Sequence, residues 1–312
     1  MTGSPVPSSV GVSVVVPTRD RPELLVRAVR AILSQEHAGD IECLVVFDQS
    51  EPHELGLGVE LPAGRTVRCL KNTRSPGLAG ARNSGVLAAT QPLVAFCDDD
   101  DEWLTGKLTA QMRLMQAHPE TPVVATGILV NFEGRDIARP APDRALEQGD
   151  FLDDRIMEVN PCTALIRREV MLERIGLVDE QIPGGYGEDY EWLLRASAVG
   201  PIHCVREPLV RVNWHASSFF ADRWRTIIDA LVYLLDRYPG FEQHPSGLAR
   251  VEGQIAFAYA GLGDGRAARA WARKAMRHRP TEKRAYVAVA CSTPFLGNDT
   301  VMRLAHRAGR GI

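Results

Sequence analysis

The sequence predicts an α/β fold with a parallel sheet, followed by an all-helical region. Short β-branched runs alternate with segments whose apolar residues recur at helical spacing. Polar residues gather where these runs end, and strand signals cease near residue 220. We therefore expect an α/β domain over residues 1–220 and a helical region over residues 221–312.

The alternation also predicts the individual elements of the first domain. The first strand, Val12 to Val16, is expected to end at Pro17, and a helix is expected to start at Pro22. Residues 135–149 are polar and rich in proline, which predicts a mobile loop. Further strands are expected at 41–47, 66–70, 93–97 and 123–132, and helices at 80–90 and from Leu104 to His118. Ligands of parallel sheets bind beyond the carboxyl ends of the strands, so the candidate site lies there.

The composition narrows the class of protein. A chain of 312 residues with 45% hydrophobic residues can bury a large core. The formal net charge of -3 gives no reason to expect a nucleic-acid partner, and the basic residues near the C-terminus are expected to form a solvated helix face. Six scattered cysteines without CxxC spacing predict a reduced, cytoplasmic protein. We expect no signal peptide and no transmembrane segment, because no apolar run approaches about 20 residues.

Four consecutive aspartates follow the strand expected at 93–97. Asp98, Asp99, Asp100 and Asp101 repel one another, so folding holds them together at a cost unless a cation is present. Oxygen ligands of this kind suit Mg²⁺ or Mn²⁺ bound to a substrate diphosphate. The alternative is a solvated helix start with no ligand.

An ordered series of motifs resembles the family-two glycosyltransferases, which have the GT-A fold. The likeness runs over about residues 10 to 218. It begins with V-S-V-V-V-P-T-R-D-R, G-L-A-G-A-R-N-S-G and F-C-D-D-D-D-E-W, and continues with N-P-C-T-A-L-I-R-R, I-G-L-V-D-E, G-E-D-Y-E-W-L-L-R and W-H-A-S-S. The resemblance implies transfer of a sugar from a nucleotide diphosphate donor, and a UDP-sugar is favoured.

The resemblance also implies which residues bind the donor. The loop after the first strand and the acid that ends the second would hold the nucleoside, and the ribose and sugar hydroxyls would contact the first two aspartates of the run. Gly77 would permit close backbone approach, and Arg82 would pair with a phosphate or with Asp98. Arg19 followed by Asp20 departs from the family pattern, so the identity of the nucleotide base in the donor is left open. The nucleotide-sugar residues are thus Pro17, Thr18, Arg19, Asp48, Gly77, Arg82, Asp98 and Asp99.

The same resemblance assigns the metal and the catalytic base. Asp100 would bind Mn²⁺ or Mg²⁺ on the diphosphate, and His215 would be a second metal ligand. Glu188 and Asp189 open a predicted helix, where either could simply be a cap. The resemblance makes Asp189 the general base of an inverting displacement and gives Glu188 a positioning role. Trp103, Trp192 and Arg195 are expected in the core.

The C-terminal helices leave more than one function open. Residues 259–280 resemble one tetratricopeptide unit, which is expected to stack on helices at about 222–238 and near Ala285. A plain helical cover is the alternative to a peptide-binding groove. The acceptor is therefore unidentified, with a glycan or a peptide both open. A sugar-phosphate nucleotidyltransferase and a non-catalytic helical-repeat binding module are the competing functions.

Overall fold

A computed structural model describes residues 9–58, 60–132, 134–214 and 223–292. Its contacts divide the chain into two compact units. The first unit contains residues 1–148, 156–180 and 188–216, and the second contains residues 149–155, 181–187 and 217–312. The strands and the acid run belong to the first unit, and the C-terminal helices belong to the second.

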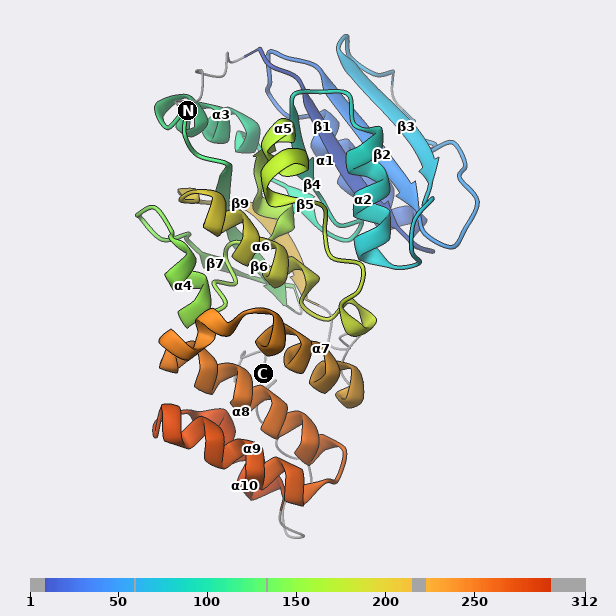
Figure 1. The fold of residues 1–312 in the computed structure, drawn as a ribbon. Helices are drawn as coiled ribbons and strands as arrows, with labels where there is room; N and C mark the ends of the chain where they lie inside the picture. The colour runs from blue at the N-terminus through green and yellow to red at the C-terminus, as the bar shows by residue number, and fades with distance from the viewer. Residues whose placement is uncertain (1–8, 59, 133, 215–222, 293–312) are drawn as a thin grey trace. The chain divides into compact units, whose positions relative to one another are not determined.

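The described residues form nine strands and ten α-helices (Figure 1). The strands are β1 (Val12–Thr18), β2 (Ile41–Phe47), β3 (Arg65–Lys71), β4 (Leu93–Phe96), β5 (Glu102–Trp103), β6 (Val123–Phe132), β7 (Arg135–Arg139), β8 (Leu165–Arg167) and β9 (His203–Trp214). The helices are α1 (Pro22–Leu33), α2 (Leu78–Ala88), α3 (Lys107–Ala117), α4 (Gln148–Asp153), α5 (Arg168–Val170), α6 (Glu188–Val199), α7 (Trp224–Arg237), α8 (Pro245–Gly261), α9 (Gly265–His278) and α10 (Lys283–Cys291).

The strands of the first unit form one mixed sheet. Its order is β3-β2-β1-β4-β8-β6-β9-β5, with β7 paired to β6. The strands from β3 to β4 are parallel, whereas β8 pairs antiparallel with both β4 and β6. The expected α/β class with C-terminal helices is confirmed, but the sheet is mixed where the sequence predicted a parallel one.

Helices cover both faces of β1, as Figure 1 shows. Val14 and Val16 lie in one core cluster with Leu25 and Val29 of α1. Val15 points to the opposite face, where a Cβ on Gly85 of α2 would come within 2.3 Å of it. The close packing of α2 on the sheet therefore requires a glycine at this position. Burial of both faces explains why β1 is apolar over nearly its whole length.

The strand expected to stop at Pro17 continues to Thr18. On the β4 side, pairing of β1 ends at Val15 with Phe96, and the Val15 carbonyl accepts the Cys97 N–H at 3.1 Å. Alternate residues of a strand face alternate neighbours, so the Pro17 nitrogen faces the side on which β4 has already ended. Proline therefore removes no ladder hydrogen bond, and the prediction that it ends the strand was wrong.

Two other local predictions were also wrong. Residues 135–149 are not simply a loop, because Arg135–Arg139 pairs with β6 and Leu146 forms a bridge with Ile202. The aspartate run does not start a helix, because it turns directly into β5. Arg135–Arg139 forms a hairpin with the end of β6, whereas Leu146 and β5 pair with partners that are distant in sequence. In each case the strand partner supplies the hydrogen bonds, and local polarity carries no signal of it.

The second unit holds an alanine-rich helical core. Ala256, Ala268 and Ala285 belong to one buried cluster contributed by α8, α9 and α10. Small side chains allow these helices to pack closely, and the Asp264 carboxylate caps α9 by accepting the Ala267 N–H at 2.9 Å. The helical character of this region is confirmed, while its identity as a tetratricopeptide unit stays a prediction. In the described part of the chain, no helix combines the length and apolar character needed to cross a membrane.

Candidate active site

The carboxyl ends of β1 and β4 meet where the strand order reverses. The chain runs outward from β1 to β2 and β3, then returns to place β4 on the other side of β1. Such a switch point opens a crevice in which α/β proteins bind ligands. Here the Thr18 hydroxyl donates to an Asp99 oxygen at 2.7 Å, and the Arg19 N–H donates to the same oxygen at 3.4 Å. Thr18, Arg19 and Asp99 are therefore brought together as predicted.

The loops that leave β1 and β2 contain left-handed backbone. Among the described non-glycine residues, only Asp20 (φ 56°) and Gln49 (φ 57°) have positive φ. Each follows the carboxyl end of a central strand, within two residues of Thr18 or Phe47. Conformations of this kind cost free energy and cluster at ligand sites, so these two loops are candidates for ligand contact.

Arg21 compensates the charge of the aspartate run. Its Nη1 lies 3.2 Å from Asp99 Oδ1 and 2.5 Å from Asp100 Oδ2. No role in offsetting the repulsion between the aspartates was assigned to Arg21 from the sequence, because Arg21 lies 78 residues from Asp99 along the chain. The only signal was a basic residue in the T-R-D-R loop. Arg21 is 48% exposed, so it can move away when a ligand enters.

Arg82 joins the acid run to the start of α6. Its Nη2 lies 2.8 Å from Asp98 Oδ1, and its Nη1 lies 2.9 Å from Glu188 Oε1. The Arg82 side chain is 3% exposed and that of Glu188 is 8% exposed, so the pair is buried. The predicted pairing of Arg82 with Asp98 is present, and the contact with Glu188 brings the start of α6 to the carboxyl end of β4.

Asp101 faces the interior instead of the crevice. It accepts the Asn213 N–H at 3.2 Å from β9, and Asn213 Nδ2 donates to the Asp100 carbonyl at 2.6 Å. Burial, together with the charges of Asp98 and Asp100, raises the pKa of Asp101 well above its ordinary value. The oxygens of Asp98 and Asp101 lie within 4.8 Å of the Cys162 sulfur. Asp101 therefore anchors the acid turn to β9, a role the sequence did not reveal.

Asp48 organises the loop that precedes α2. Its carboxylate accepts hydrogen bonds from Asn72 at 2.8 Å, from Gln49 at 2.9 Å and from the Gly77 N–H at 3.1 Å. Burial acts to raise the pKa of Asp48, but these hydrogen bonds outweigh it and lower the pKa. Gly77 has φ 113°, a conformation that favours glycine. Asp48 and Gly77 thus meet as expected at the strand ends, and Asp48 shapes the loop between them.

Glu180 holds the other side of the same loop. Its carboxylate pairs with Arg74 and accepts hydrogen bonds from Ser75 Oγ at 2.6 Å and Asn83 Nδ2 at 2.7 Å. Burial opposes ionisation of Glu180, but these donors outweigh it and lower its pKa to about 2. Glu180 is the last residue of the I-G-L-V-D-E motif. It received no role from sequence because its partners lie about 100 residues away.

The helix α6 begins at Glu188, as predicted, and its other notable side chains pack inward. Trp192 is 1% exposed and donates to the Gly176 carbonyl at 3.2 Å, while Arg195 pairs with Glu191 at 2.8 Å. Trp103 is 2% exposed in β5. The core assignments of the two tryptophans are confirmed, whereas Arg195 is half-buried. Asp189 is partly exposed in the first turn of α6, where the helix dipole favours negative charge.

The predicted site residues also include Arg19, Pro17 and His215. The Arg19 side chain is 57% exposed, and its Nε lies 3.9 Å from an Asp20 carboxylate oxygen. Pro17 lies within β1, so its ring is part of the sheet and not of the following loop. His215 lies outside the described residues.

Glu188 should make the stability of the protein depend on pH. The Arg82 guanidinium is shared between the Asp98 and Glu188 carboxylates. Burial raises the pKa of Glu188 to about 7, and the negative charge of Asp189 adds to this effect, although the positive charge of Arg82 acts to lower the pKa. The folded protein therefore holds this proton more tightly than the unfolded chain. Its contribution to stability is complete below about pH 4.5 and is lost as the pH rises through 7.

We expect Glu188→Gln to remove this dependence. Glutamine does not ionise. Between about pH 4.5 and 8, the free energy of unfolding of the wild type should therefore fall by on the order of 3 kcal/mol relative to that of the variant. Urea unfolding across this range measures the difference. Glu23→Gln, at an exposed first-turn position of α1, is the matched control and should track the wild type. A constant difference between wild type and Glu188→Gln at every pH would contradict the assignment.

The fold and site together define an α/β protein whose candidate ligand site is a switch point lined by carboxylates. Comparison with known proteins specifies the family. The model of glycosyl transferase family 2 matches residues 13–175, which is more than half of the chain, so the chain belongs to this family. The match favours a transferase over the nucleotidyltransferase and binding-module alternatives.

The matches between this chain and individual curated relatives are shorter. The chain is 31% identical over 104 residues to UDP-Glc:alpha-D-GlcNAc-diphosphoundecaprenol beta-1,3-glucosyltransferase WfgD of Escherichia coli, covering 33% of this chain and 40% of that protein. It spans 54% or less of the length of the first curated relatives it matches.

Solved structures match nearly the whole chain. S. aureus TarS in complex with UDP-GlcNAc has a TM-score of 0.61 at 15% identity, covering 96% of this chain and 92% of that one. The mannosyltransferase PcManGT from Pyrobaculum calidifontis, in complex with GDP-Man and Mn²⁺, has a TM-score of 0.52 at 15% identity, covering 99% and 90%. At this identity the likeness shows the fold, which is GT-A with additional C-terminal helices.

Proposed function

We propose that this chain transfers a sugar from a nucleotide diphosphate donor to an acceptor nucleophile with inversion at the anomeric carbon. The observation that carries the proposal is the buried bridge from Asp98 through Arg82 to Glu188. It ties the carboxylates at the switch point to the helix that carries Asp189. A donor site and a proton acceptor therefore lie on one rigid framework, as a displacement reaction requires.

The donor binds in the crevice between the ends of β1 and β4. The Thr18–Asp99 contact and the Asp48-anchored loop surround the place where a nucleoside fits. Asp98 and Asp99 offer acceptors to ribose and sugar hydroxyls. WfgD is named for a UDP-Glc donor and TarS is described with UDP-GlcNAc, which supports a UDP-sugar here.

The acid run fits a divalent cation. The Arg21 guanidinium already lies against Asp99 and Asp100, so this pocket accommodates positive charge between carboxylates. Hard oxygen ligands suit Mn²⁺ or Mg²⁺, and PcManGT is described with Mn²⁺. When bound through Asp100, the cation would supply Lewis-acid stabilisation of the leaving diphosphate. His215 is proposed as a further ligand.

Asp189 is the general base, and Glu188 is a positioning residue. The Glu188 carboxyl is buried and committed to Arg82, so it does not reach an acceptor. Asp189 comes next on α6 and is partly exposed. Its carboxylate takes the acceptor proton while the acceptor oxygen attacks C1 from the face opposite the diphosphate. The bond from C1 to the diphosphate oxygen breaks in the same displacement, so the configuration inverts.

The proposal is tested by product analysis. The protein with Mn²⁺ and a panel of nucleotide sugars should release nucleoside diphosphate, and release should increase when glycan or peptide acceptors are supplied. Release of pyrophosphate from a nucleoside triphosphate and a sugar phosphate would instead identify a nucleotidyltransferase. Absence of every release reaction across the panel would favour the binding module.

Metal dependence gives a separate prediction. A UDP-sugar should raise the melting temperature by several degrees with Mn²⁺ present and by much less in excess chelator, because stabilisation follows affinity for the native state. Asp100→Asn should lose most of this metal-dependent shift in differential scanning fluorimetry. The control Asp143→Asn, at an exposed residue, should keep it. Equal stabilisation with and without metal would remove the cation from the proposal.

A further inference from the structure

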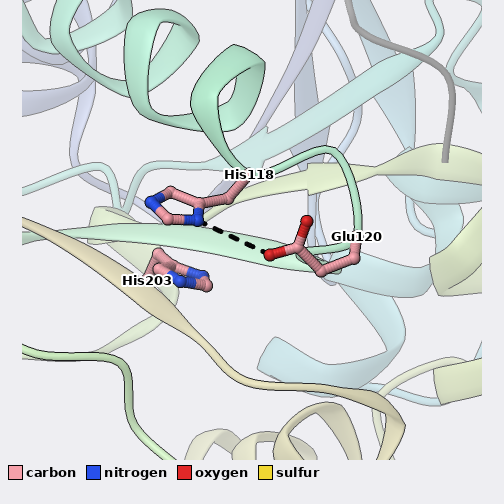
Figure 2. Close-up of side chains that lie close together, drawn as sticks. All are labelled: His118, Glu120 and His203. Atoms are coloured by element: carbon pink, nitrogen blue, oxygen red, sulfur yellow. Dashed lines mark ion pairs between the residues drawn. The ribbon is translucent and has the colours of Figure 1, made fainter. Parts of the chain in front are cut away.

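A second group of metal-ligating side chains lies apart from the aspartate run. His118, Glu120 and His203 each present one ligand atom, and these three atoms lie within 4.8 Å of one another (Figure 2). His118 Nδ1 is 3.5 Å from a Glu120 oxygen, and the two imidazole rings stack with centroids 3.8 Å apart. Two imidazoles and a carboxylate form a ligand set typical of zinc sites that keep one position for water.

One ring nitrogen of this group is buried and unsatisfied. The Nδ1 atom of His203 is shielded from solvent and has no hydrogen-bond partner among the described residues. A buried ring nitrogen of this kind costs free energy in the apo protein. A bound cation would satisfy it, because a neutral imidazole nitrogen donates its lone pair to a metal.

The backbone around the group is already ordered. Arg167 donates to the Pro119 carbonyl at 2.9 Å and to the Thr121 carbonyl at 3.3 Å, which braces the turn that carries His118 and Glu120. The Thr121 hydroxyl lies 2.9 Å from the Pro201 carbonyl, two residues before His203. The two ligand-bearing segments are therefore held side by side by buried polar contacts, and little ordering remains for an ion to impose.

The group is remote from the donor site. His203 is the first residue of β9, whereas Asn213, which binds Asp100 and Asp101, is near the other end of that strand. Ten residues of strand separate them, which is roughly 30 Å. An ion at the histidine group therefore cannot contact a diphosphate bound at the acid run.

We propose that His118, Glu120 and His203 form a Zn²⁺ site that links the turn after α3 to the start of β9. Each side chain supplies one ligand, and water completes a tetrahedron. The stacked rings must turn so that their nitrogens converge, and His118 can do so because it ends α3 with a side chain 39% exposed. The site is independent of the transfer reaction.

The test is Zn²⁺ titration by calorimetry in saturating Mg²⁺, which occupies the donor-site carboxylates. The wild type should bind one Zn²⁺ ion. Glu120→Gln or His118→Ala should each lower the affinity for this ion by at least about tenfold. Both variants alter exposed side chains and should fold. Co²⁺ in place of Zn²⁺ should give the visible absorption of a tetrahedral centre in the wild type only. His203→Ala should also abolish binding.

Two controls separate this site from adventitious binding. His278→Ala breaks another histidine–carboxylate pair, 2.8 Å from Glu252, and should leave Zn²⁺ affinity unchanged. Cys204→Ser should also leave it unchanged, because successive side chains of a strand point to opposite faces and the thiol faces away from His203. Zn²⁺ affinity equal in wild type, His118→Ala and Glu120→Gln, or no binding to the wild type, would overturn the proposal.

Discussion

Asp189→Asn should lower turnover by roughly two to four orders of magnitude, the usual range for loss of a general base. Asparagine matches aspartate in size and retains capping ability, but it does not accept a proton. Because α6 is held by Arg82 through Glu188, the helix start should remain in place. Melting temperature and donor affinity should therefore stay close to wild type while kcat falls.

The controls for this variant are kinetic and stereochemical. Asp229→Asn, at an exposed position of α7, should keep wild-type turnover. Glu188→Gln should change KM and kcat together, because its proposed role is positioning. NMR of the wild-type product should show the anomeric configuration opposite to that of the donor. Retained configuration, or undiminished turnover of Asp189→Asn, would require another base or another mechanism.

Replacing Arg82 should cause the largest loss of stability. Arg82→Met leaves Glu188 buried without its partner and Asp98 without its nearest cation. Removing one partner from a buried ion pair costs about 3–5 kcal/mol. This loss is expected at about pH 8, where Glu188 is ionised in the wild type and the variant must either bury an uncompensated charge or take up a proton. Chemical denaturation measures this loss. Arg82→Lys keeps the charge but not the fork that reaches both carboxylates, so it should lie between wild type and Arg82→Met.

A double-variant cycle identifies the cause of that loss. Arg82→Met combined with Glu188→Gln should recover part of the stability, because the buried residue at 188 no longer carries a charge. Arg206→Met is the matched control, since Arg206 and Asp143 are 3.8 Å apart with exposed side chains. An exposed pair contributes about 0–1 kcal/mol. If the two arginine variants lose equal stability, the bridge does not hold α6 in place.

Local patterns in the sequence predicted most of the first half of the sheet. The run at 41–47 became β2 without change, and the runs near β1, β3 and β4 differ from the structure by a few residues at their ends. A buried strand needs a continuous apolar segment, which is visible in the chain itself. The acidic residues at the strand ends could also be found in the sequence, because each directly follows its own strand.

Charge compensation was decided only by the tertiary structure. Arg21 reaches Asp99 across 78 residues, Arg82 reaches Glu188 across 106, and Glu180 reaches Asn83 across 97. The antiparallel pairing of β5 with β9 and the meeting of His118 with His203 are equally non-local. The sequence by itself therefore determined the apolar strands β1 to β4 and β6 and the carboxylates that follow them, whereas β5, β7, β8 and β9 emerged only in the structure. The folded chain determined which cation faces each carboxylate, because that depends on strand order and register, and neither leaves a periodic signal along the chain.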